Sequence, residues 1–334
     1  MISFGSISQR TAAWASKEMI DYALPIEVLA RFAQSKPIPK NTSDNAKFRR
    51  PIPFAVATTP LIEGVTPVGH AMQYEDVPVT LQQFGDFVEI TDKVVDMAED
   101  PVLKDASQLS GEQAAETMEV ILWGILRAGT SVAFMNGTVR TAVNTALTLT
   151  AGLTMLRNVT RALKAQRAKF ITEMLAGSAN FKTEPVAAAF IAFGHTDFEP
   201  DLRAIPGWVP VELYGAAMKA LPYEVGKVDN HRFILSPLLA PFVNGGAVIA
   251  TMKTTGIPGT NACDIYPMVF IAKNSYGNCA LRGSNAMTPM VLNPGVPRGG
   301  DPLGQRGTVG WKSYYAAVRL NEAWMYRVEA AVTI

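Results

Sequence analysis

One apolar segment, punctuated by proline and glycine, constrains the fold of this chain more than any other feature of its sequence. Residues 58–69 read TTPLIEGVTPVG, where prolines and glycines alternate with aliphatic side chains. Core strands rarely hold two prolines, and surface loops are usually polar. The segment lies between two strand-like stretches, residues 46–58 and 73–92, and no helical pattern separates them. The sequence therefore predicts a long β excursion, and it leaves open what buries the apolar tip.

The composition is that of a folded protein and excludes several functional classes. The 334 residues are 48% hydrophobic and 18% charged, which allows two domains or one domain with large excursions. A net charge of +1 argues against wholesale binding to DNA or to anionic lipid. No apolar run is long enough for a transmembrane helix, and the start MISFGSISQR lacks the pattern of a secretory signal.

Charge is unevenly distributed along the chain although the total is near zero. Basic residues predominate in residues 1–50, and acidic residues predominate in residues 51–110. Opposite charges of this kind indicate complementary surfaces that meet within one chain or between copies. Independent solvated faces are the alternative interpretation.

Two helices are predicted in the first half of the chain. The first covers residues 110–128, with Ser110 as N-cap and Gly129 at its end. The second covers residues 153–170, where apolar residues recur at helical spacing and form one stripe: Leu156, Val159, Leu163 and Phe170. Its other faces carry a basic strip without any acidic residue: Arg157, Arg161, Lys164 and Arg167. This strip is either a solvated face, a partner for the acidic first helix, or a surface that faces a polyanion.

The two ends of the chain carry weaker patterns. Residues 11–34 predict a helical arm in two pieces, because Pro25 interrupts the helical spacing. Near the other end, residues 314–320 and 324–328 alternate in the manner of strands on either side of Asn321-Glu322. The sequence therefore predicts a closing β-hairpin.

Residues that carry chemistry are sparse. No histidine has a second histidine or cysteine at metal spacing, and no nucleophile elbow, phosphate-binding loop or calcium loop occurs. Cys263 and Cys279 have no CxxC partners, so we expect two free, buried thiols in a reducing compartment. His195 with Asp197 is the one candidate acid–base pair, and it keeps a small hydrolase open as an alternative. We otherwise predict no catalytic residue, cofactor or metal.

A succession of motifs identifies a family. In order along the chain, these are ISQRTAAWASKEMIDYALPIEVLARF, KPIPKNTSDNAKFRR, TTPLIEGVTPVG, VTLQQFGDFVEITD, AEDPVLKDASQLSGEQAAETME, LRAGTSVAFMNG, GSANFKTEPVAAAFIAFGHTDFEPDLRAIPGWVPV and GTVGWKSYYAAVRLNEAWMYRVEAA. Their order and spacing resemble the major capsid protein family of N-4-type podophages and related prophages. The similarity covers essentially the whole chain.

The resemblance implies an α+β fold, the tailed-phage major capsid fold of the Hong Kong 97 type. It implies an N-terminal arm in residues 1–45 and an extended β-loop, the E-loop, in residues 46–80. A peripheral domain with a spine helix near residues 110–128 would comprise residues 81–150 and 305–334. An axial domain would comprise residues 151–304.

The resemblance also implies a structural function. Identical subunits would form hexamers and pentamers and self-assemble, in the bacterial host cytoplasm, into the icosahedral head shell of a virion that encloses double-stranded phage DNA. The implied partners are the portal, scaffold or decoration proteins, and the packaged DNA through weak non-specific contact, without a membrane. An encapsulin-like shell around cargo is an alternative.

The family's architecture assigns candidate contact residues on this chain. The E-loop tip would lie on a neighbouring subunit through Pro60, Leu61, Ile62, Glu63, Gly64, Val65, Pro67 and Val68. The arm would contact adjacent subunits through Trp14, Tyr22, Arg49 and Arg50, and we expect its basic charge to pair with E-loop acidity across subunit boundaries. The basic strip of the second helix would face the lumen of the shell.

Overall fold

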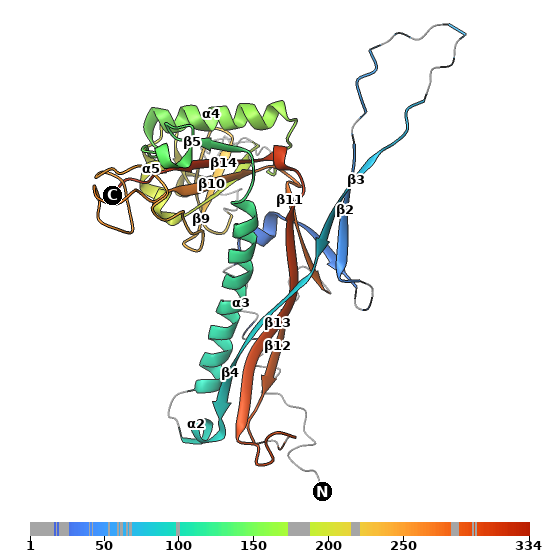
Figure 1. Ribbon diagram of the computed structural model, residues 1–334, viewed down its shortest axis with the longest axis vertical. Helices are drawn as coiled ribbons and strands as arrows, with labels where there is room; N and C mark the ends of the chain where they lie inside the picture. The colour runs from blue at the N-terminus through green and yellow to red at the C-terminus, as the bar shows by residue number, and fades with distance from the viewer. Residues whose placement is uncertain are drawn as a thin grey trace, which may run out of the picture.

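The structure is a computed structural model with an upper body, a long narrow stem below it and a thin hairpin that projects away from both (Figure 1). Each of the three parts is built on its own β-sheet. The structure describes residues 17, 19, 27–39, 41, 43–52, 54–58, 60, 63, 64, 66, 69–97, 101–172, 188–214, 221–281, 287–295, 297 and 299–334.

The stem pairs one long helix with a five-stranded sheet. The helix is α3 (Val102–Leu126), which the short helix α2 (Asp92–Met97) precedes. The central strand β13 pairs with β4 on one side and with β12 and β11 on the other, while β1 extends the sheet from β11. The strands are β1 (Gln34–Ile38), β4 (Gln82–Thr91), β11 (Tyr276–Leu281), β12 (Met287–Leu292) and β13 (Arg306–Arg319). Burial of Ala114 and Met118 of α3 against Trp311 and Tyr315 of β13 holds the two layers together.

The predicted first helix exists, but its predicted start at Ser110 is wrong, because α3 begins at Val102. Ser110 and Gly111 are buried inside the helix and are not its cap. A Cβ atom on Gly111 would collide with the carbonyl oxygen of Met19 in the arm. The small residues that indicated a helix start are therefore positions where the arm packs closely against the helix.

The upper body is a seven-stranded sheet with a helix on each side. Its strand order is β5-β14-β10-β6-β9-β8-β7. The strands are β5 (Val132–Phe134), β6 (Phe190–Gly194), β7 (Val209–Pro210), β8 (Glu224–Val228), β9 (His231–Leu235), β10 (Tyr266–Ile271) and β14 (Met325–Ala330). Helix α4 (Leu149–Ala165) crosses one face, and the upper end of α3 reaches the other (Figure 1). Short helices join these elements: η2 (Leu29–Phe32), η3 (Arg140–Ala142), η5 (Thr196–Phe198), α5 (Glu199–Arg203), η6 (Val211–Leu213) and η7 (Glu322–Trp324).

The apolar stripe predicted for the second helix packs as expected. Leu156, Val159 and Leu163 are fully buried in one cluster with Phe190 and Phe233 of the sheet. The helix itself is shorter than predicted at its end, since it stops at Ala165. Both cysteines are free and buried, as the sequence predicts.

The prediction of a closing β-hairpin is wrong. The strands exist, but β13 belongs to the sheet of the stem and β14 to the sheet of the upper body. Helix η7 separates them, and the Asn321 side chain caps it by accepting a 3.1 Å hydrogen bond from the Ala323 N–H. The chain therefore passes here from one sheet to the other, and each strand pairs with segments far away in sequence.

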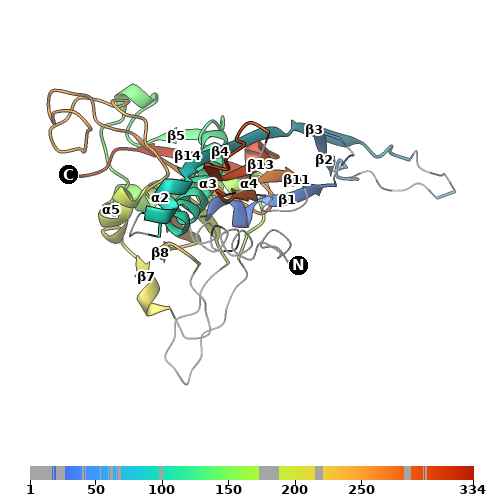
Figure 2. The same ribbon diagram turned by 90° about the horizontal axis from the view of Figure 1, so that it is seen from below.

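The projecting hairpin consists of β2 (Asn45–Pro51) and β3 (Tyr74–Thr80), paired antiparallel from Asn45↔Thr80 to Pro51↔Tyr74. It extends away from both larger sheets (Figure 2). The β excursion predicted from the apolar segment is thus present, although its strand pairing ends at Pro51. The predicted strand 73–92 is two strands, because β3 pairs in the hairpin and β4 pairs with β13 in the stem.

Candidate functional site

The projecting hairpin leaves apolar side chains without burial in their own chain. Beyond the last paired residues, Phe54 is 61% exposed and Val56 is 73% exposed, and Ile52 and Met72 are also exposed. Phe54 contacts only the ring of His70 among the aromatic pairs of the described residues, at 6.5 Å between centroids. Exposed apolar side chains of this kind are typical of surfaces that bind another molecule.

The tip of this hairpin is described in part. Pro60, Glu63 and Gly64 are exposed, and Gly64 adopts a φ of 78° in a turn, a conformation that favours glycine. The other predicted tip residues lie outside the described residues: Leu61, Ile62, Val65, Pro67 and Val68.

Arg49 and Arg50 meet acidic partners in the same hairpin. Arg49 Nε lies 2.7 Å from Asp76 Oδ1, and Arg50 Nε lies 2.8 Å from Glu75 Oε2. The hydrogen bond from Arg49 holds the pKa of the Asp76 carboxyl below its ordinary value. At these positions the opposite charges meet within one chain, which is one of the two arrangements that the charge pattern allowed. Trp14 and Tyr22, the other predicted arm contacts, lie outside the described residues.

A buried carboxylate that the sequence did not reveal holds the arm on the stem. Glu119 of α3 accepts hydrogen bonds through Oε1 from the backbone N–H groups of Val28 and Leu29, the latter at 2.8 Å. The Tyr276 hydroxyl donates to the Leu29 carbonyl at 2.6 Å. Burial raises the pKa of Glu119 to about 7, although both backbone donors oppose this. By helical spacing Glu119 belongs with the half-buried Glu112 and the exposed Glu116, so no local signal distinguishes it.

The basic strip lies on the outer side of α4. Arg157 Nε is 3.1 Å from Asp229 Oδ2, and Lys164 Nζ lies 5.6 Å from the centre of the Phe170 ring. Arg161, Lys164 and Arg167 are exposed and form no ion pair within the part of the chain that the structure describes. Arg167 follows the helix, with a φ of 55° after the end of α4.

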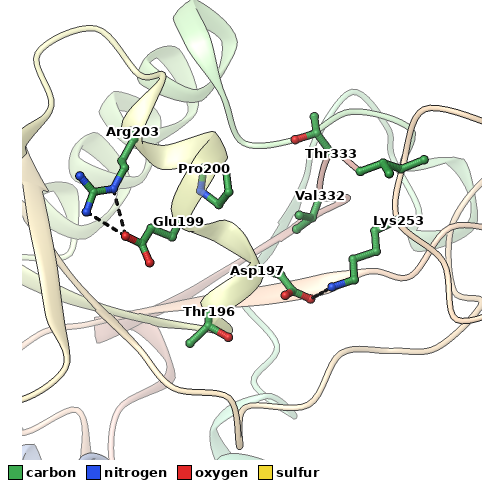
Figure 3. Close-up of a pocket in the computed structure, with 9 residues that line it drawn as sticks. Thr196, Asp197, Glu199, Pro200, Arg203, Lys253, Val332 and Thr333 are labelled. Carbon is green, nitrogen blue, oxygen red and sulfur yellow. Dashed lines mark hydrogen bonds and ion pairs between the residues drawn. The ribbon is translucent and has the colours of Figure 1, made fainter.

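His195 and Asp197 lie close together in a turn of the upper body, with 3.3 Å between His195 Nδ1 and Asp197 Oδ2. Asp197 lines a pocket there, in which it contacts Lys253 (Figure 3). The Asp197 N–H donates to His195 Nδ1 at 3.1 Å, so the ring caps helix η5. The Asp197 carboxylate accepts hydrogen bonds from Lys253 Nζ at 2.7 Å and from the Tyr266 hydroxyl at 2.8 Å. Burial lowers the pKa of His195. Because these contacts already occupy Nδ1 and the carboxylate, the geometry favours a structural pair over a general base.

No cluster of three histidine, cysteine, aspartate or glutamate side chains that could hold a metal occurs in the described ranges. Within the same ranges, no helix is both long and apolar enough to cross a membrane.

Comparison with known proteins identifies the family. The sequence profile of a phage capsid protein family matches residues 74–328. The major capsid protein of Pseudomonas phage KPP21 is 21% identical over 183 residues, which are 52% of this chain and 46% of that protein. The match thus spans about half of this chain and less than half of that relative.

Solved structures show the same fold at low sequence identity. The capsid of Ralstonia phage GP4 is similar with a TM-score of 0.69 at 10% identity, over 92% of both chains. The capsid of cyanophage P-SCSP1u has a TM-score of 0.57 at 13% identity, over 90% of this chain and 87% of that one. The holo-SrpI encapsulin of Synechococcus elongatus PCC 7942 has a TM-score of 0.52 at 10% identity, over 92% and 88%.

These similarities confirm the predicted tailed-phage capsid fold, with its projecting hairpin, long stem helix and upper sheet. The narrower N-4-type assignment stays a prediction. Because the family profile covers residues 74–328, most of the sequence, this chain belongs to the phage capsid protein family.

Proposed function

We propose that this chain is the major capsid protein of a tailed phage, which self-assembles through hexamers and pentamers into an icosahedral head shell around double-stranded DNA. The exposed apolar side chains of the β2–β3 hairpin carry this proposal. Phe54 and Val56 lie within residues 46–80, the proposed E-loop, and none of the residues that the structure describes buries them. A neighbouring copy would supply the missing burial.

Shell assembly fits the shape of the subunit. A specific interface of standard size buries about 1,600 Å² in total, and a projecting hairpin supplies area without enlarging a core. The base of the hairpin packs on the stem through Ala46 and Phe48, which are buried against Ile38 and Cys279. Its outer part has no such support among the described residues, so contact with a neighbour would also fix its conformation. Repetition of moderate interfaces in a closed shell makes them collectively strong.

We propose the division into arm, E-loop, peripheral and axial domains at the boundaries predicted from the family. Residues 1–45 would form the arm, residues 81–150 and 305–334 the peripheral domain, and residues 151–304 the axial domain. Strands β11 and β12 fall in the last range but pair with β13. Strand β14 falls in the peripheral range but pairs with β10. The two domains would therefore share strands.

Packaged DNA, a portal and scaffold or decoration proteins are the partners that this function requires, and assembly would take place in the host cytoplasm. The similarity to the SrpI encapsulin supports a second candidate, a shell that encloses cargo proteins. Nucleic acid inside particles from infected cells would support the phage head, whereas a packaged enzyme would support the second candidate. Neither candidate assigns a catalytic role to the chain.

Size-exclusion chromatography and electron microscopy of the expressed chain test the proposal. We expect capsomers or closed particles from the unchanged protein. Phe54→Ser with Val56→Ser should prevent particle formation and leave the fold intact by circular dichroism. Leu213→Ser is the control, because Leu213 is equally exposed but lies on η6 of the upper body. A chain that stays monomeric at high concentration would contradict the proposal.

A further inference from the structure

Two helices of the subunit expose stripes of opposite charge. On α3, Asp105, Glu112 and Glu116 follow one side of the helix together with Leu109, which is 65% exposed, and Val120, which is 53% exposed. None of the three carboxylates forms an ion pair within the described residues. We call this side the acidic stripe.

The second stripe is on α4. Arg157, Arg161 and Lys164 are spaced by four and three residues, so they stand on one side of the helix, about 10 Å from first to last. Residues 149–172 contain no acidic residue. Arg157 forms an ion pair with Asp229, whereas Arg161 and Lys164 form no ion pair within the described residues.

These two stripes cannot meet within one chain. The buried side of α4 packs on the sheet face that carries Phe190 and Phe233. The upper end of α3 packs on the opposite face, against Ile191 and Phe193. The helices therefore lie on opposite sides of the seven-stranded sheet (Figure 1).

We propose that the basic strip of α4 docks on the acidic stripe of α3 of a neighbouring copy of this chain. The inference rests on the proposed shell function and names one of its contacts. The spacing fits, because Glu112 and Glu116 are separated by one helical turn, as are Arg157 and Arg161. The exposed Leu109 and Val120 would add apolar burial between the charged rows.

A contact between two different surfaces of identical subunits is heterologous. Repetition of such a contact around an axis closes a ring when the rotation fits, which is the arrangement of a capsomer. Charge complementarity would set the register of neighbours and reject wrong orientations more than it would add affinity. Packaged DNA is the competing occupant of the basic strip.

Charge exchange between the two helices tests the proposal. Arg161→Glu with Lys164→Glu on α4, or Glu112→Lys with Glu116→Lys on α3, places like charges face to face. We expect each double variant to form about tenfold fewer capsomers and particles, or fewer still. The quadruple variant restores opposite charges and should recover assembly. Arg161→Lys with Lys164→Arg keeps the charge and is the matched control, which should assemble normally.

Sedimentation velocity measures assembly in this series, and circular dichroism confirms that each variant is folded. Normal assembly of the α4 double variant would overturn the inference. Normal assembly with reduced binding to a DNA duplex would overturn it in favour of DNA as the occupant. Folded double variants that both fail, with no recovery in the quadruple variant, would also overturn it. An unchanged chain that never assembles would instead overturn the proposed function, and the inference with it.

Discussion

Replacement of Glu119 by glutamine tests whether a buried carboxylate links the arm to the stem. Its side chain is 4% exposed, and one carboxylate oxygen accepts the N–H groups of Val28 and Leu29. The other oxygen, Oε2, is buried without a hydrogen-bond partner. The variant Glu119→Gln keeps an acceptor for the arm but removes the negative charge.

The magnitude follows from the raised pKa. Burial raises the pKa of Glu119 from 4.5 to about 7 in the folded chain, so this group stabilises the fold fully below pH 4.5. That contribution, about 3 kcal/mol in total, is lost as the pH rises through 7. Between pH 5.5 and pH 8.5 the loss is about 2 kcal/mol, whereas the glutamine variant should not show it.

Urea unfolding of the dilute, unassembled chain at both pH values measures the effect. Tryptophan fluorescence reports on the transition, and Trp123, one of five tryptophans, is buried beside the arm residues Val28 and Leu29. Other groups also titrate, so the difference between the unchanged chain and the variant is the relevant quantity. Glu89→Gln is the control, because Glu89 is exposed on β4 and should leave the pH dependence unchanged. Parallel pH profiles for the unchanged chain and Glu119→Gln would refute the reasoning.

Three further substitutions test other parts of the structure. Gly111→Ala should lower the urea midpoint although alanine favours helices by about 1 kcal/mol, because its Cβ would displace the carbonyl of Met19; a raised midpoint would contradict this. Arg232→Met removes the cation that donates to the buried Glu224 at 2.6 Å and should destabilise the upper body by about 3–5 kcal/mol in thermal unfolding. Adding Glu224→Leu should recover only part of the loss, because the Tyr214 hydroxyl and the Leu221 N–H also donate to Glu224. His231 is fully buried and its pKa is lowered to about 4 by desolvation, so its contribution is present above pH 6.5 and lost as the pH falls toward 4. His231→Gln should flatten this acid dependence in thermal melts, and an unchanged acid limb would show that other groups cause it.

Much of the local structure could be predicted because it follows from the short-range spacing of apolar residues. The alternation of strand-like residues around residues 58–69 predicted the projecting hairpin before any partner was known. The buried side of α4 followed from the spacing of Leu156, Val159 and Leu163. Periodicity of this kind depends only on neighbouring residues, so a single sequence contains it.

The candidate contact surfaces were predicted in part. The projecting hairpin was predicted from composition, since the Pro and Gly residues of the segment argue against a core strand, and its role as an E-loop stays a proposal. The basic strip of α4 could also be read from the sequence. The sequence did not show that the acidic stripe of α3 lies on the other side of the seven-stranded sheet. That placement depends on which sheet face each helix covers, and the two helices are far apart in sequence.

The sequence by itself determined the projecting β excursion, the apolar side of α4 and the free cysteines. Only the tertiary structure decided that β13 and β14 belong to different sheets, that Ser110 lies within a helix, and that Glu119 is buried by the arm. The physical reason is the same in each case. The local sequence indicates whether a segment favours a strand or a helix. The segment or side chain that it pairs with lies up to hundreds of residues away and depends on the packing of the whole chain.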